Sequence, residues 1–139
     1  MIELIYVSKA YKRFEETELE DMLRVFRHSN DKSNITGLLL YDGFGTFVQV
    51  LEGDDHKVKS TFERIKQDTR HSRINVLGEH TITQPSFPEW RMGFQLLDAS
   101  SAKNLAGYSD FLLQQNRTDY LSEQPSFVAD LLHHFKSNL

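Results

Sequence analysis

Apolar residues recur along the chain with two different periods, and together they predict strands and helices in the order β-α-β-β-α-β. Strands are predicted where apolar residues alternate with polar ones or form short runs. They are expected at residues 2–8, 35–42, 46–53 and near 74–83. The second and third strands flank the turn "DGFG", residues 42–45, whose two glycines are typical of a hairpin.

Two helices are predicted from apolar residues spaced three and four apart. Thr17 is the expected N-cap of the first helix, because Glu20 stands three residues later and completes a capping-box pattern. The pattern of this helix ends near residues 27–31. The second helix is predicted to begin at Asp54 or Asp55, either of which can cap it.

The C-terminal part of the chain predicts further elements. These are a proline-containing loop, a fifth strand at a sheet edge and two helices, at residues 84–90, 91–97, 101–115 and 126–139. The whole order is that of an α+β, ferredoxin-like βαββαβ sandwich with an extra edge strand and two C-terminal helices. We expect a main domain over residues 1–97 and a helical extension over residues 98–139.

Gln49 interrupts an apolar strand, "FVQVLEG", of the kind that lies buried in a sheet. A buried carboxamide has two donors and an acceptor to satisfy, and leaving it unpaired costs about 1–3 kcal/mol. In the predicted fold the first and third strands are central neighbours, which brings Tyr6 next to Gln49. If both side chains point to the helical face, a polar group in the cleft between the helices would satisfy the rest of Gln49.

Composition excludes several function classes. The chain of 139 residues has no cysteine, which excludes disulfides, thiolate metal sites and cysteine nucleophiles and fits a cytoplasmic protein. Sixteen Lys and Arg stand against twenty Asp and Glu, and the net charge of −4 disfavours nucleic-acid binding through a general positive field. The first residues do not form a signal peptide, no apolar run approaches the ~20 residues of a membrane span, and no histidine pattern indicates a metal site.

Five segments occur in the order and spacing typical of one family. They are "LIYVS", "NITGLLLY", "FVQVLEG", "FERIKQDTRH" and "FPEWRMGF". In these segments the chain resembles the BLUF domains, blue-light sensors that use FAD, over roughly residues 2–97. The resemblance implies a short single-domain photoreceptor that is not an enzyme, binds a flavin chromophore, forms a homo-oligomer and signals to an unknown downstream protein.

The resemblance also implies roles for particular residues. Tyr6 and Gln49 match the pair that exchanges an electron and a proton with the flavin under light, and Trp90 and Met92 match the segment that relays the signal. The residues that match flavin contacts are Asn30, Gln49, Ser29, Ile35, Arg64, Asp68 and His71. Two positions depart from the family pattern: Ser29 replaces an Asn or His, and Arg91 replaces a smaller residue.

Each of these residues also has an ordinary structural interpretation. Gln49 taken alone would lie on an edge or solvated strand, and Tyr6 would be a core tyrosine whose hydroxyl reaches the surface. Arg64, Asp68 and His71 would form a solvated helix end with an Arg64–Asp68 pair. The alternative function is a small acylphosphatase-like hydrolase on the same fold, but the segment "YVSKAYKRF" lacks the glycine that its phosphate loop needs.

Overall fold

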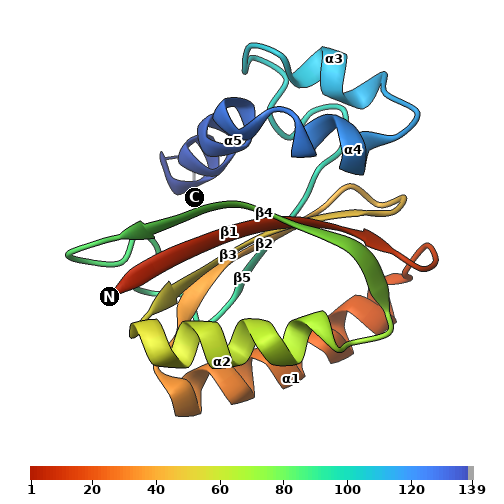
Figure 1. Ribbon diagram of the computed structural model, residues 1–139. Coiled ribbons are helices and arrows are strands. Elements are labelled where there is room, and N and C mark those ends of the chain that lie inside the picture. The colour runs from red at the N-terminus through yellow and green to blue at the C-terminus, as the bar shows by residue number, and fades with distance from the viewer. Residues whose placement is uncertain (138–139) are drawn as a thin grey trace.

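Five strands form one mixed sheet in the computed structural model, which describes residues 1–137 (Figure 1). The strands are β1 (Ile2–Ala10), β2 (Thr36–Tyr41), β3 (Thr46–Gly53), β4 (His71–Thr81) and β5 (Gly93–Leu96), in the spatial order β4-β1-β3-β2-β5. The first four pair antiparallel, whereas β5 pairs in parallel with β2 at one edge. The ferredoxin-like α+β fold and its extra edge strand are confirmed.

Two helices, α1 (Glu16–Ser33) and α2 (Asp55–Lys66), lie side by side on one face of the sheet (Figure 1). Their apolar stripes are buried against the side chains that β1, β2 and β3 point to this face. Tyr6, Leu39 and Leu51 belong to this core. A strand alternates its side chains, so Gln49, two residues before Leu51, points to the same face.

The boundaries of α1 differ from the prediction at both ends. Thr17 is not the N-cap: the helix starts earlier because Glu15 caps it and the Glu15 N–H donates to Oε1 of Glu18 at 3.0 Å. The helix also continues past residues 27–31, until Asn34 adopts a left-handed conformation (φ 54°) that ends it. Asn30 therefore lies inside the last turns of α1 and not in the loop that follows.

Three helices cover the opposite face, where two were predicted (Figure 1). They are α3 (Tyr108–Leu112), α4 (Arg117–Ser122) and α5 (Pro125–Ser137). The single helix expected over residues 101–115 was wrong. Gly107, at φ 90°, precedes α3, so that helix begins only at Tyr108. The Asn116 side chain then caps a separate helix, α4, by accepting a hydrogen bond from the Asp119 N–H at 3.2 Å. The last two residues of the helix predicted over 126–139 lie outside the described residues.

The sheet thus separates two hydrophobic cores. The upper core joins α3, α4 and α5 to the strand side chains that point away from α1 and α2, among them Ile5, Val7, Leu38 and Val50. The C-terminal helices therefore share a core with the sheet and do not pack as a separate unit. Within residues 1–137 no helix is long and apolar enough to cross a bilayer.

Candidate functional site

Tyr6 and Gln49 are opposite one another in the antiparallel pair of β1 and β3, as the topology predicted. The Tyr6 hydroxyl donates a hydrogen bond to Oε1 of Gln49, and the two residues are only 3% and 2% exposed. The Tyr6 ring also packs 5.2 Å from the ring of Phe62 on α2. Gln49 is therefore a buried residue of a central strand, and the edge-strand interpretation is wrong.

Burial sets the protonation of this pair. It raises the pKa of the Tyr6 phenol well above its ordinary value, and the negative charge of nearby Asp68 raises the pKa further. The phenol consequently keeps its proton at neutral pH and remains a hydrogen-bond donor to Gln49.

The amide nitrogen of Gln49 has a much weaker partner than the amide oxygen. Nε2 donates to Sδ of Met92 at 3.4 Å, and a thioether sulfur is a weak acceptor. Met92 is buried, so water does not replace this contact. Gln49 therefore has donor capacity that a stronger acceptor, such as a carbonyl oxygen, would use.

A cleft between α1 and α2 leads to Gln49. Its volume is about 170 Å³. Apolar side chains form its walls: Val25, Phe26, Leu51 and Ile65. Polar side chains line the remainder: Ser29, Asn30, Gln49, Thr61, Arg64 and Asp68. Apolar walls together with the buried polar groups of Asn30 and Gln49 suit a heterocycle whose edge carries donors and acceptors.

Asn30 contributes an open acceptor to this cleft. Its Nδ2 donates to the Arg91 carbonyl oxygen at 2.6 Å, which fixes the orientation of the carboxamide. Among residues 1–137, no donor forms a hydrogen bond with its Oδ1. A ligand N–H in the cleft would satisfy that oxygen.

Arg64 and Ser29 lie across the mouth of the cleft from one another. Arg64 Nη1 donates to Oγ of Ser29 at 3.4 Å, and Nη2 donates to Oγ1 of Thr61 at 3.3 Å. The Arg64–Asp68 pair of the structural interpretation does not form, because Asp68 pairs with Arg70 instead. Hydrogen bonds from Arg70 hold the pKa of Asp68 below its usual range.

His71 and Ile35 lie outside the walls of the main cleft. The His71 ring bridges Oγ of Ser8 at 2.8 Å and the Ile65 carbonyl oxygen at 2.7 Å, and it lines a smaller cavity of about 30 Å³ beside Tyr6. Ile35 is fully buried in the core under α1 and α2. Their flavin contacts remain predictions.

Trp90 and Met92 lie on opposite faces of the sheet although only one residue separates them. Met92 contacts Gln49 in the core that α1 and α2 cover, whereas Trp90 packs against the upper core. Trp90 also stacks on Phe87, with ring centroids 5.6 Å apart. The chain crosses the edge of the sheet between these two residues, immediately before β5 begins.

The crossing segment, residues 90–92, forms hydrogen bonds with α1. The one from Arg27 was not predicted from the sequence. Arg27 Nε donates to the Met92 carbonyl oxygen at 2.9 Å, beside the bond from Asn30 to Arg91. Arg91 Nη1 in turn donates to Oδ1 of Asn34 at 2.9 Å. Arg27 lies three residues before Asn30, so helical spacing gave a signal that could have linked the two.

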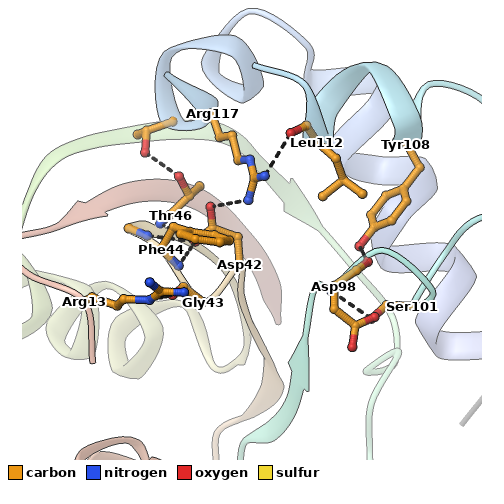
Figure 2. Close-up of polar contacts among 12 residues, drawn as sticks. Arg13, Asp42, Gly43, Phe44, Thr46, Asp98, Ser101, Tyr108, Leu112 and Arg117 are labelled. Atoms are coloured by element: carbon orange, nitrogen blue, oxygen red, sulfur yellow. Dashed lines mark hydrogen bonds and ion pairs between the residues drawn. The ribbon is translucent and has the colours of Figure 1, made fainter. Parts of the chain in front are cut away.

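A second polar cluster fastens the turn between β2 and β3 to the C-terminal helices (Figure 2). Oδ1 of Asp42 accepts from the N–H groups of Phe44, Gly45 and Thr46 at 2.8–2.9 Å, which closes the turn. Oδ2 of Asp42 pairs with Nη1 of Arg117 at 3.1 Å. Asp42 was assigned only to a turn from sequence, because the spacing of 75 residues to Arg117 leaves no local signal.

Arg117 continues this cluster into α3 and α4. Its Nη2 donates to the Leu112 carbonyl oxygen at 2.8 Å, and its guanidinium lies 5.1 Å from the ring of Phe44 (Figure 2). Nearby, Thr46 and Thr118 share a hydroxyl–hydroxyl hydrogen bond of 2.9 Å. The helical extension is thus attached to the sheet by buried polar contacts as well as by the upper core.

The chain also matches known proteins. The family model described as "Sensors of blue-light using FAD" matches residues 1–93. The photoactivated adenylate cyclase subunit alpha of Euglena gracilis is 40% identical over 74 residues, which are 53% of this chain and 7% of that protein. This chain covers so little of the cyclase subunit that the match does not indicate cyclase activity in this chain.

Two solved structures show the same likeness in three dimensions. A bacterial light-regulated adenylyl cyclase matches with a TM-score of 0.73 and 31% identity, over 89% of this chain and 36% of that one. BlrB, a BLUF protein in its dark state, matches with a TM-score of 0.72 and 28% identity, over 99% of this chain and 96% of that one. None of these matches supports the hydrolase alternative.

Proposed function

The chain belongs to the BLUF family, the sensors of blue-light using FAD, and on that premise we propose that Tyr6 and Gln49 form its light switch beside a flavin held between α1 and α2. The observation that carries the proposal is the buried Tyr6–Gln49 hydrogen bond at the closed end of the cleft. Packing alone does not require the Tyr6 hydroxyl or the Gln49 carboxamide. Two apolar side chains would fill the same space and would have no buried polar groups that need hydrogen-bond partners.

The residues of the cleft fit a flavin ring. Asn30 Oδ1 would accept a hydrogen bond from a ring N–H, and the amide group of Gln49 would donate to a ring carbonyl. Apolar walls would cover the two ring faces. Ser29, Arg64 and Asp68 would contact the polar chain that leaves the ring at the mouth, and His71 and Ile35 would support the ring from behind the walls.

We take the flavin to be FAD rather than FMN. The cleft, at about 170 Å³, is smaller than the roughly 300–1,000 Å³ of pockets that enclose a whole drug-sized ligand. Only part of a dinucleotide would therefore fit in the cleft, and the remainder would lie outside it. The family description, which names FAD, supports this choice.

The bound flavin would supply blue-light absorption and an excited state that is a strong oxidant. With a flavin bound, Tyr6 would be the electron donor, and its hydroxyl proton would move along the existing hydrogen bond to Oε1 of Gln49. Both would return to Tyr6 afterwards, and Gln49 would be left rotated or in a tautomeric form, with a different arrangement of donor and acceptor. A carboxamide suits this step because it is neutral and both donates and accepts, whereas a carboxylate would only accept.

Met92 is the residue through which the change would leave the pocket. Its sulfur accepts from Nε2 of Gln49, so reorienting the amide breaks that contact. Met92, Arg91 and Trp90 form the crossing segment that joins the pocket to β5 and to the upper core. We propose residues 1–97 as the sensor and residues 98–139 as the extension that passes its state to a downstream protein or to a second copy of the chain.

The sensor itself would catalyse no reaction, and the cysteine-free composition favours a cytoplasmic location. The test is the colour and photochemistry of the purified protein. We expect a yellow protein that releases FAD completely on heat denaturation, as chromatography of the supernatant would reveal. A protein without flavin, or with flavin covalently retained by the denatured chain, would refute the proposal.

A further inference from the structure

Glu52 is a fully buried carboxylate on the face of β3 opposite Gln49. It accepts three hydrogen bonds: from the Thr36 hydroxyl at 3.1 Å, the Ser86 N–H at 2.6 Å and the Phe87 N–H at 2.9 Å. Within the described part of the chain, no Lys, Arg or His forms an ion pair with it. A carboxylate buried without a cation is costly, so its hydrogen bonds are its only compensation.

The two backbone donors belong to the loop that leads to Trp90. Phe87 stacks on Trp90 with an angle of 20° between the rings, and the Trp90 N–H donates to the Phe87 carbonyl oxygen at 3.1 Å. The Gly37 N–H donates to the Trp90 carbonyl oxygen at 3.0 Å. Glu52 therefore fixes the backbone of residues 86–87, and with it the Phe87 ring on which Trp90 stacks.

Trp90 also lies against Gly93. A Cβ at position 93 would come within 2.7 Å of the Trp90 indole, so the indole lies directly against this backbone. The segment from Ser86 to Gly93 is thus held near both ends. Glu52 bonds its first residues on the face of the sheet that α3, α4 and α5 cover. Arg27 and Asn30 of α1 bond the carbonyl oxygens of Met92 and Arg91 on the other face.

We propose that Glu52 is a positioning residue of the light switch. Its carboxylate clamps residues 86–87 and so keeps Trp90 docked on the upper core. A displacement of Met92 is then passed to Trp90 and β5 instead of being absorbed by a loose loop. This inference rests on the proposed function, because it assumes that Gln49 and Met92 respond to light.

Only a carboxylate meets the geometry at this position. Ser86 donates to Oε2 and Phe87 donates to Oε1, so both oxygens must be acceptors. In Glu52→Gln one oxygen becomes an NH₂ group, which faces a backbone donor and cannot accept from it. The variant keeps the size of the side chain and loses one clamp.

The test uses the flavin-loaded full-length protein and its one tryptophan, Trp90, as a fluorescent reporter. We compare the intact protein, Glu52→Gln and the matched control Glu3→Gln, which makes the same change directly opposite Glu52 on β1. In Glu52→Gln we expect a normal flavin red shift, greater quenching of Trp90 by acrylamide in the dark and loss of the light-dependent change in Trp90 emission. The control should match the intact protein in all three.

Trp90 emission and quenching in Glu52→Gln that equal those of the intact protein, in dark and light, would overturn the inference. If Glu52→Gln does not fold, Phe87→Leu breaks the same connection while leaving the carboxylate bonded. A light response of Trp90 that survives in Phe87→Leu would equally overturn it. If the intact protein shows no red shift, the proposed function fails, and the dark quenching of Glu52→Gln against Glu3→Gln still decides whether the clamp exists.

Discussion

Replacing Asp42 by alanine should destabilise the protein more than any change to its ion-pair partner. Asp42 is the side chain on which the turn between β2 and β3 depends, since it accepts from three backbone N–H groups and from Arg117. Its side chain is 1% exposed, against 16% for that of Arg117. Water therefore does not take over the contacts that Asp42 makes.

The magnitude follows from what each substitution leaves behind. Asp42→Ala leaves three amide donors and a guanidinium without their acceptor, and breaking a buried pair in this way costs about 3–5 kcal/mol. Arg117→Leu leaves the carboxylate bonded to the three amides, so we expect about 1–3 kcal/mol, the range for losing a hydrogen-bond partner. Asp42→Asn, with its oxygen toward the amides, should resemble Arg117→Leu.

The assay is urea unfolding followed by circular dichroism, at one flavin concentration for all variants, because a ligand of the native state adds to its stability. A domain of this kind is stable by about 5–15 kcal/mol, so the loss predicted for Asp42→Ala is measurable. An Asp42→Ala protein that loses less free energy of unfolding than Arg117→Leu would refute the reasoning. It would mean that the turn keeps its amides satisfied without the carboxylate.

Three further predictions concern the pocket and the crossing segment. Because burial raises the pKa of Tyr6, the light-induced spectral shift should keep its amplitude as the pH rises from about 6 through the ordinary tyrosine value near 10; an amplitude that falls around pH 10 while the protein stays folded would contradict it. Tyr6 should also affect stability: the free energy of unfolding should fall only as the pH rises above the ordinary tyrosine pKa near 10, because there the unfolded state loses the phenol proton while the folded state keeps it. Asn30→Ala should weaken flavin retention, measured by dialysis, by about 1–3 kcal/mol, or roughly 5–150-fold, and unchanged retention would exclude Asn30 as a ligand. Arg91→Ser removes the contacts with Asn34 and Asp31, so it should leave the spectral shift intact and change the light dependence of elution in size-exclusion chromatography; equal elution profiles would contradict this.

Much of the fold followed from local pattern. The strand predicted over residues 2–8 is confirmed, and its alternation puts Tyr6 in one core and Val7 in the other. The neighbourhood of Tyr6 and Gln49 followed from the topology alone, because the ferredoxin-like order makes β1 and β3 partners. The C-terminal helices were predicted less well, because α3 and α4 have only five and six residues, too few to show a helical period.

The placement of Trp90 was beyond sequence reasoning for a definite reason. Residues two apart on a strand point to the same face, so strand alternation would have put Trp90 beside Met92. The structure separates them because β5 begins only at Gly93, and the preceding residues cross the sheet edge. Glu52 and Arg27 were missed because their partners lie far along the chain, at Phe87 and Met92.

The spectrum of the flavin before and after blue light tests the central claim most directly. We predict that the intact protein shows a reversible red shift of its flavin band, and that Gln49→Leu and Tyr6→Phe bind flavin but show none. Both variants keep the cleft walls and remove one partner of the buried hydrogen bond. A normal reversible shift in Gln49→Leu would contradict the claim that this bond is the switch.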